Sequence, residues 1–255
     1  MQVMTWWEVT EEAVKTHRLC GLSVAGGQQT PVINEIAKVI PAYYTDPKRV
    51  AQLLAKLGKP AAAAHVEQKL PTQLTIRSGD LGEILCNAYV HQATAFNLGI
   101  NRLRWKDHRN MSMRGEDVLA FRLDQSNGSL GILKAEVKSR AEMKTAVIDE
   151  ARAALCANGG LPSPHALAFV ADRLNETGDT VLGAALDMAL LKDGIRDSQI
   201  SHMLFTFSGS NPANLLKTNL HAYAGPVVQH YVGLRVDRHQ NFINAVFAQI
   251  GKEGT

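Results

Sequence analysis

The sequence has few cysteines and no long apolar run. Its three cysteines, Cys20, Cys86 and Cys156, are odd in number and far apart. They offer neither a disulfide framework nor a Cys-x-x-Cys zinc site, which indicates a reducing compartment. No stretch approaches the roughly 18 apolar residues that a membrane-spanning helix needs. The N-terminus, MQVMTWWEVTEEAVK, has acids where a signal peptide has a basic segment, so we expect a cytoplasmic protein with no membrane association.

Several signature motifs are also missing. The nine histidines form no HxxxH or Cys-His cluster, so the sequence does not favour zinc. The segment 21-GLSVAGGQQTP-31 contains Gly26-Gly27 but lacks the Lys-Ser/Thr ending of a phosphate-binding loop, and we interpret it as a linker. Nothing in the chain indicates ATP hydrolysis, so any such step would come from a partner. The net charge of +3 permits contact with a polyanion without requiring it.

The composition and the periodicity predict a folded α/β protein with a mixed sheet. Hydrophobic residues make up 45% of the chain and charged residues 20%, which is typical of globular proteins. The clearest helix is 46-DPKRVAQLLAKLGKP-60, where Asp46 is a helix N-cap and Pro47 occupies the first turn. We expect helices within 31–69, 78–93, 141–160, about 180–192 and 211–219, and strands at 100–106, 116–123, 130–138, 165–171, 203–208 and 227–236.

A hairpin joins two of these strands through 124-DQSNGS-129. If the turn is centred between Ser126 and Asn127, Asp117 lies across from Glu136. If Asn127-Gly128 form a two-residue turn, Asp117 lies across from Lys138. In either register Asp117 meets a Glu136-x-Lys138 pair whose side chains share one face of the strand.

Two acids side by side repel each other unless a positive charge lies between them. Hard divalent cations prefer carboxylate oxygens and suit that role. A metal bound there would polarise a phosphate and activate water, while Lys138 stabilises developing charge. The pattern therefore favours metal-dependent phosphodiester hydrolysis. A Glu-x-Lys pair is also common as an ordinary cross-strand ion pair on a solvated sheet face.

The order of these motifs resembles the PD-(D/E)XK nuclease superfamily. The segments 77-RSGDLGEIL-85, 104-RWKDHRN-110, 114-RGEDVLAF-121 and 134-KAEVKSR-140 resemble the HamA family, the nuclease subunits of the Hachiman antiphage defence system. The resemblance implies a restriction-endonuclease-like core, which we expect in residues 77–255. The helical patterns within 31–69 predict that residues 1–76 form a helical N-terminal region packed on or beside it.

The resemblance also implies roles for individual residues. Asp117 and Glu136 would bind Mg²⁺ or Mn²⁺ with the carbonyl of Val137, Lys138 would be the catalytic lysine, and Glu83 would reach the same cleft as a further catalytic and metal-binding acid. DNA would be the substrate, and a superfamily 2 helicase subunit would control the nuclease. The resemblance, and not strand alternation, selects Asp117 over its neighbour Glu116 as the inward-facing acid.

Cationic residues surround these motifs. We predict phosphate contacts for a set in which ordinary surface roles are equally compatible with the sequence: Arg104, Lys106, Arg109, Arg114, Lys134 and Arg140. Two other functions are compatible with the same motifs. The chain could be a non-catalytic nucleic-acid sensor or scaffold of the same fold, or a ribonuclease.

Overall fold

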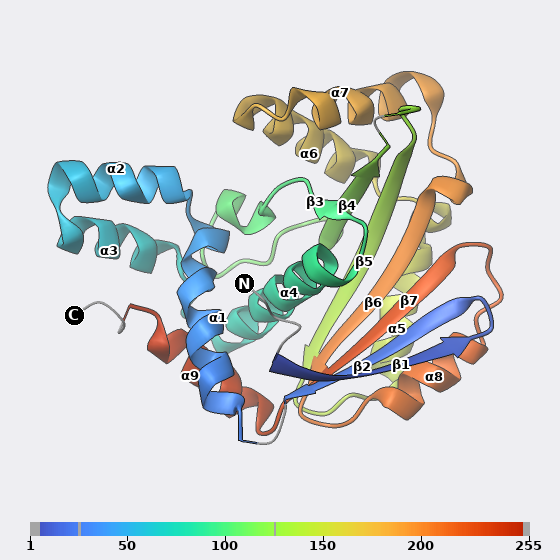
Figure 1. Ribbon diagram of the computed structural model, residues 1–255, viewed down its shortest axis with the longest axis horizontal. Helices are drawn as coiled ribbons and strands as arrows, with labels where there is room; N and C mark the ends of the chain where they lie inside the picture. The colour runs from blue at the N-terminus through green and yellow to red at the C-terminus, as the bar shows by residue number, and fades with distance from the viewer. Residues whose placement is uncertain (1–5, 25–26, 125, 252–255) are drawn as a thin grey trace.

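A seven-stranded mixed sheet forms the centre of the molecule, with helices on both faces (Figure 1). The computed structural model describes residues 6–24, 27–124 and 126–251. The strand order is β1-β2-β7-β6-β5-β4-β3. The strands are β1 (Trp7–Val14), β2 (His17–Val24), β3 (Asn97–Leu98), β4 (Val118–Leu123), β5 (Leu130–Arg140), β6 (Ile200–Ser208) and β7 (Val228–Arg235). The predicted mixed α/β fold is confirmed.

The helices form two layers, a separate pair and a projecting hairpin. They are α1 (Gln29–Tyr44), α2 (Pro47–Leu57), α3 (Lys59–Lys69), α4 (Leu74–Ala93), α5 (Thr145–Cys156), α6 (Pro164–Thr177), α7 (Thr180–Met188), α8 (Ala213–His221) and α9 (His239–Gln249). One layer is built from α1, α4 and α9, the other from α5 and α8. The pair α6–α7 lies at the β4–β5 end of the sheet (Figure 1). In the part of the chain that the structure describes, none of the helices combines the length and apolar character needed to cross a membrane.

Side-chain alternation along the central strands separates the two layers. On β6, Met203 and Phe205 are buried against the α1–α4–α9 layer, and Leu204 between them is buried against the α5–α8 layer. A strand that is buried on both faces reads as a continuous apolar run, as 203-MLFTFS-208 does. The main core therefore lies between the sheet and α4.

The β4–β5 hairpin adopts one of the two predicted registers. Val118 pairs with Ala135 and Leu119 with Lys134. This is the register of a turn centred between Ser126 and Asn127. It places Asp117, immediately before β4, across from Glu136.

The expectation of a helical N-terminal region is wrong for the first two elements. Residues 7–24 form the β1–β2 hairpin, and β2 pairs in parallel with β7. Six central residues of this edge strand are exposed, so β1 shows no alternation of buried and exposed positions. The segment interpreted as a linker also changes: Gly21–Val24 belong to β2, residues 25–26 lie outside the described residues, and α1 begins at Gln29. The helices predicted within 31–69 are confirmed as α1, α2 and α3.

Two predicted strands are helices. Residues 165–171 lie within α6, because Ser163 accepts a hydrogen bond from the Ala166 amide and Pro164 occupies the first turn. The segment 100–106 contains the 3-10 helix η2 (Arg102–Trp105), where Leu103 enters the core. In both cases a short alternation of apolar residues suggested a strand, and tertiary packing selected a helix.

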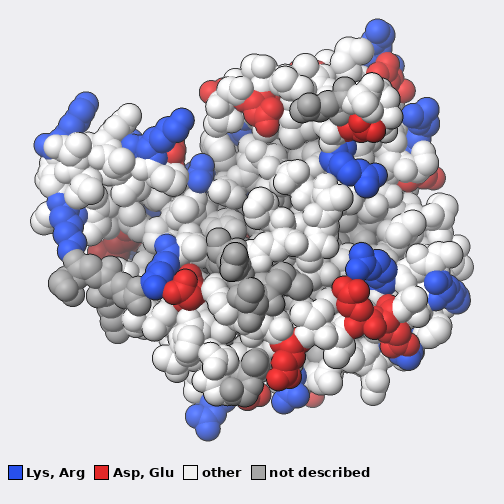
Figure 2. Space-filling view, viewed as in Figure 1, with Lys and Arg blue, Asp and Glu red and all other residues white. Residues whose placement is uncertain are grey.

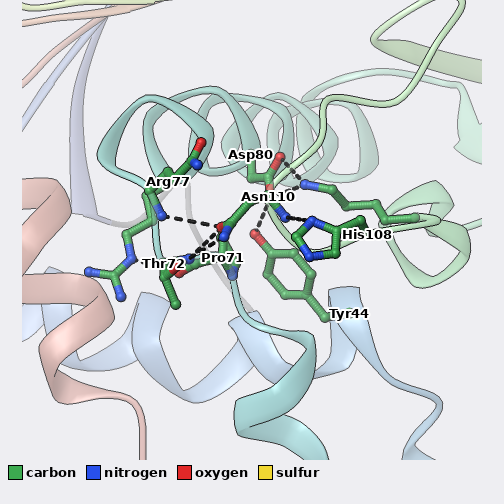
Figure 3. Close-up of polar contacts among 9 residues, drawn as sticks. Tyr44, Pro71, Thr72, Arg77, Asp80, His108 and Asn110 are labelled. Carbon is green, nitrogen blue, oxygen red and sulfur yellow. Dashed lines mark hydrogen bonds and ion pairs between the residues drawn. The ribbon is translucent and has the colours of Figure 1, made fainter.

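A buried polar network fixes the segment between η2 and β4, which carries Asp117 at its end (Figure 3). Lys106 Nζ lies 2.9 and 2.7 Å from the two carboxylate oxygens of Asp80, and the Tyr44 hydroxyl donates to Asp80 at 2.7 Å. Further along, Asn110 Oδ1 accepts from the amides of Thr72 and Gln73, where α4 begins. The segment is thus tied to the start and the second turn of α4, and through Asp80 to α1.

We expect Lys106→Met to lower the free energy of unfolding by about 3–5 kcal/mol, because it leaves the Asp80 carboxylate buried without its cation. The side chains of Lys106 and Asp80 are 4% and 5% exposed. Lys144→Met is the matched control, since Lys144 and Glu142 are 70% and 73% exposed and such pairs contribute less than about 1 kcal/mol. Urea denaturation of both variants measures the difference. Equal losses would show that the buried pair does not stabilise the fold.

Candidate active site

Asp117 lies at the point where the anchored segment enters β4. Its Oδ2 accepts a hydrogen bond from the Val137 amide at 2.8 Å, so the carboxylate is held against β5. The neighbouring Glu116 turns elsewhere: its carboxylate accepts from the Ser163 amide at 2.6 Å and the Ser163 hydroxyl at 3.1 Å. Glu116 therefore tethers the start of α6, and Asp117 is the acid that faces Glu136 and Val137.

Glu136 and Lys138 lie on the face of β5 that α5 covers. Lys138 Nζ is 3.1 Å from Glu136 Oε1 and 2.8 Å from Glu150 Oε1 on α5. The side chains of Glu136 and Lys138 are 17% and 12% exposed, whereas that of Glu150 is 65% exposed. The lysine is thus shared between one half-buried acid and one at the surface. Nothing in the sequence pointed to Glu150, because its pairing with Lys138 depends on how α5 packs.

Glu83 approaches Asp117 from the opposite layer. Gly82 of α4 packs closely on β5, where a Cβ atom would come within 3.0 Å of Val137. Glu83 follows on the same helix, and its Oε2 is buried without a hydrogen-bond partner among the described residues. Because Val137 and Glu136 point to opposite faces of β5, Glu83 and Glu136 reach Asp117 from different sides.

The electrostatics of the three acids follow from this arrangement. Two effects raise the pKa of Glu136 from 4.5 to about 7: burial is the larger, and the charge of Asp117 comes second. Lys138 lowers this pKa, but by less. Burial and the charge of Asp117 also raise the pKa of Glu83 well above its usual range. Burial raises the pKa of Asp117 itself, despite the hydrogen bond from Val137. Asp117 is therefore the acid that disfavours ionisation of both others.

This set of donors fits a hard divalent cation. Asp117 and Glu136 supply carboxylate oxygens, and Val137, which follows Glu136 and contacts Asp117 through its amide, also has a backbone carbonyl. Within the described ranges, no group of three acids, histidines or cysteines is close enough to hold a metal by itself. Mg²⁺ does not require one, because it is commonly bound through one or two carboxylates together with water and substrate phosphate. A cation there would also relieve the repulsion that raises both pKa values.

Three of the predicted phosphate contacts have other partners. Arg104 donates two hydrogen bonds to the Ala42 carbonyl, at 3.0 and 2.8 Å, and joins η2 to α1. Lys106 is the buried partner of Asp80. Lys134 is 4% exposed and donates to three backbone carbonyls at and just beyond the C-terminal end of α5. These contacts give the three cations roles within the fold.

The other three predicted cations are more accessible. Arg114 and Arg140 are exposed, and Arg109 is half-buried. The Arg114 carbonyl accepts a hydrogen bond from Arg102 at 3.2 Å, so Arg102 lies beside it. On the face shown in Figure 2, further Lys and Arg side chains gather over the projecting α2–α3 hairpin. We did not predict phosphate contacts for these cations from the sequence.

A cavity of about 410 Å³ opens beside Asp117. It lies between α4, η2, the segment that precedes β4, and α6. One wall residue, Asn87, is on α4 one turn after Glu83. Helical spacing from Glu83 could have pointed to Asn87, but the cavity itself depends on α6, which the sequence suggested was a strand.

We expect Glu136→Gln to stabilise the metal-free protein at pH 8 by about 1–3 kcal/mol. Because the pKa of Glu136 is raised from 4.5 to about 7, the folded state keeps a proton that the unfolded state loses, and stability falls as pH rises through that window. Below pH 4.5 the gain should vanish. Denaturation in EDTA at pH 4 and pH 8 measures it, with Glu142→Gln, 73% exposed, as the control. A Glu136→Gln protein that is less stable at pH 8 would contradict the repulsion described above.

The similarity of this chain to known proteins covers all of the elements described above. The family model described as HamA matches residues 6–250. The "Hachiman protein HamA" of Bacillus cereus is 25% identical over 246 residues, which cover 94% of this chain and 86% of that protein. The matched region contains every element of the sheet and every residue of the site around Asp117. This protein belongs to the HamA family.

Proposed function

We propose that this protein is a metal-dependent nuclease that hydrolyses phosphodiester bonds of DNA. The observation that carries the proposal is the contact of Asp117 with Val137, across from Glu136 and Lys138. Two carboxylates of raised pKa, a backbone carbonyl and a lysine around one point are the groups that such a reaction needs. If Glu136 and Lys138 formed only an ordinary surface ion pair, they would not require Asp117 beside them.

The residues divide the work between them. Asp117, Glu136 and the Val137 carbonyl would hold Mg²⁺ or Mn²⁺, which supplies polarisation of the phosphate and a more acidic water. Lys138 presents its ammonium beside Glu136 and stabilises charge that develops on the phosphate. The exposed Glu150 holds Lys138 in position before substrate binds. Glu83 contributes a further carboxylate from the α4 side of Asp117.

We further propose a role in antiphage defence, with control by a superfamily 2 helicase partner. The name of the Bacillus cereus relative, a Hachiman protein, supports the defence role. Control by a helicase partner is the expectation that the motif resemblance implies, and it agrees with the lack of an ATP-hydrolysis motif in this sequence. The proposed location is the cytoplasm.

The test is cleavage of plasmid DNA by the purified protein, alone and with any helicase encoded beside it. We expect Mg²⁺-dependent cleavage that EDTA abolishes. Glu136→Gln and Lys138→Met should each lower the rate at least about 100-fold, the size of effect seen when a group that stabilises transition-state charge is removed. Glu142→Gln, an exposed acid just beyond β5, should leave the rate unchanged.

A parallel assay with single-stranded RNA separates a ribonuclease from a deoxyribonuclease. Cleavage of RNA alone would replace DNA as the substrate. Nucleic-acid binding without cleavage under every metal and partner condition would overturn the proposal in favour of a sensor or scaffold. A Glu136→Gln protein that still cuts would overturn the assignment of the site.

A further inference from the structure

The cavity beside Asp117 is lined by polar and charged side chains and by aromatic rings. Its lining includes Asn87, Arg102, Trp105, Arg114, Asp117 and Phe169. Its volume of about 410 Å³ falls within the range of about 300–1,000 Å³ typical of small-molecule sites. Because Asp117 forms part of the wall, whatever enters the cavity lies next to the proposed catalytic centre.

Asn87 lines this cavity and carries an unsatisfied polar atom. Its side chain is on α4 and is 3% exposed. Its Oδ1 has no hydrogen-bond partner among the described residues. A buried amide oxygen without a donor costs about 1–3 kcal/mol, so this residue of the cavity wall favours a ligand that brings an N–H group.

Aromatic rings supply the apolar part of the cavity. Trp105 and Phe169 meet edge to face, with ring centroids 6.3 Å apart and planes at 89°. The two rings come from η2 and α6, so they join the two sides of the cavity. Flat aromatic surfaces of this kind bind nucleobases by stacking, with about 1–3 kcal/mol per base.

Two arginines of the cavity wall provide positive charge for the phosphates that flank a bound base. Arg102 lies close enough to Asp117 and Glu83 to lower the pKa of both, against the larger effect of burial. Its guanidinium donates to the carbonyl of Arg114, whose side chain is exposed. The cavity thus combines a hydrogen-bond acceptor, stacking surfaces and two arginines next to an acid of the active site.

We propose that this cavity binds an unstacked nucleobase of the substrate, with an N–H group of the base directed at Asn87 and its ring against Trp105. Arg102 and Arg114 contact the flanking phosphates, and the adjoining phosphodiester lies at Asp117. The inference rests on the proposed nuclease function and narrows its substrate. A base inside a regular duplex is stacked and paired, so the substrate is single-stranded or locally opened nucleic acid.

The test uses a single-stranded oligonucleotide that carries 2-aminopurine, an analogue of adenine whose emission changes on stacking. Titration in EDTA prevents cleavage. Ala166→Phe fills the cavity from α6 while leaving Asn87 and Trp105 in place. Ala168→Phe, at an exposed position of the same helix, is the matched control. We expect a change in emission with wild type and Ala168→Phe, and at least a tenfold smaller change with Ala166→Phe.

A second measurement locates the base directly. An oligonucleotide with 5-iodouracil should crosslink on irradiation to the peptide that contains Trp105 or Phe169, and Ala166→Phe should abolish that crosslink. Equal emission and crosslinking in Ala166→Phe and wild type would overturn the inference, as would a wild-type protein that shows neither signal. These binding readouts are independent of cleavage, so a protein that cuts DNA without them refutes the base site alone. A protein that gives both signals but never cuts refutes the nuclease and retains the base site.

Discussion

The burial of Asp117 between two other carboxylates is the constraint on which the site depends. Glu83 approaches it from α4 on one face of the sheet, and Glu136 lies across from it on the other. The fold accepts this repulsion because the surroundings hold Asp117 firmly: the Val137 amide binds its carboxylate, and the preceding segment is tied down by the pair of Lys106 and Asp80. Carboxylates that rigid neighbours hold close together favour the binding of a cation between them.

The same constraint explains the distribution of positive charge. Three of the six cations that the sequence suggested for phosphate contact are used inside the fold, as Lys134 is at the end of α5. The cations whose charges act on Asp117 are two others, Arg102 and Lys138. A phosphate that enters between them would meet two cations together with the acids that we propose bind the metal.

Part of this architecture follows from the sequence. The hairpin turn placed Asp117 against Glu136 in one of two registers, because pairing in a hairpin is set by its turn. Asp46 and Pro47 located α2, because capping residues act locally. The failures involve contacts between distant parts of the chain. The sequence of the edge strand β1 has no periodic pattern of burial. The sequence of the first part of α6 has the pattern of a short strand. The partner of Lys138 is known only once α5 has packed. Strand alternation assigns faces, but it does not say which helix covers each face.

The central claim is that Asp117 and Glu136 bind a divalent metal. Titration with Mn²⁺, followed by electron paramagnetic resonance of the free ion, tests it without requiring a substrate or a partner. The account predicts a site in the wild-type protein that is lost in Asp117→Asn, kept in Glu142→Gln, and weakened below the pKa of about 7 of Glu136, where protons compete with the metal. Binding of Mn²⁺ by Asp117→Asn with wild-type affinity would contradict it.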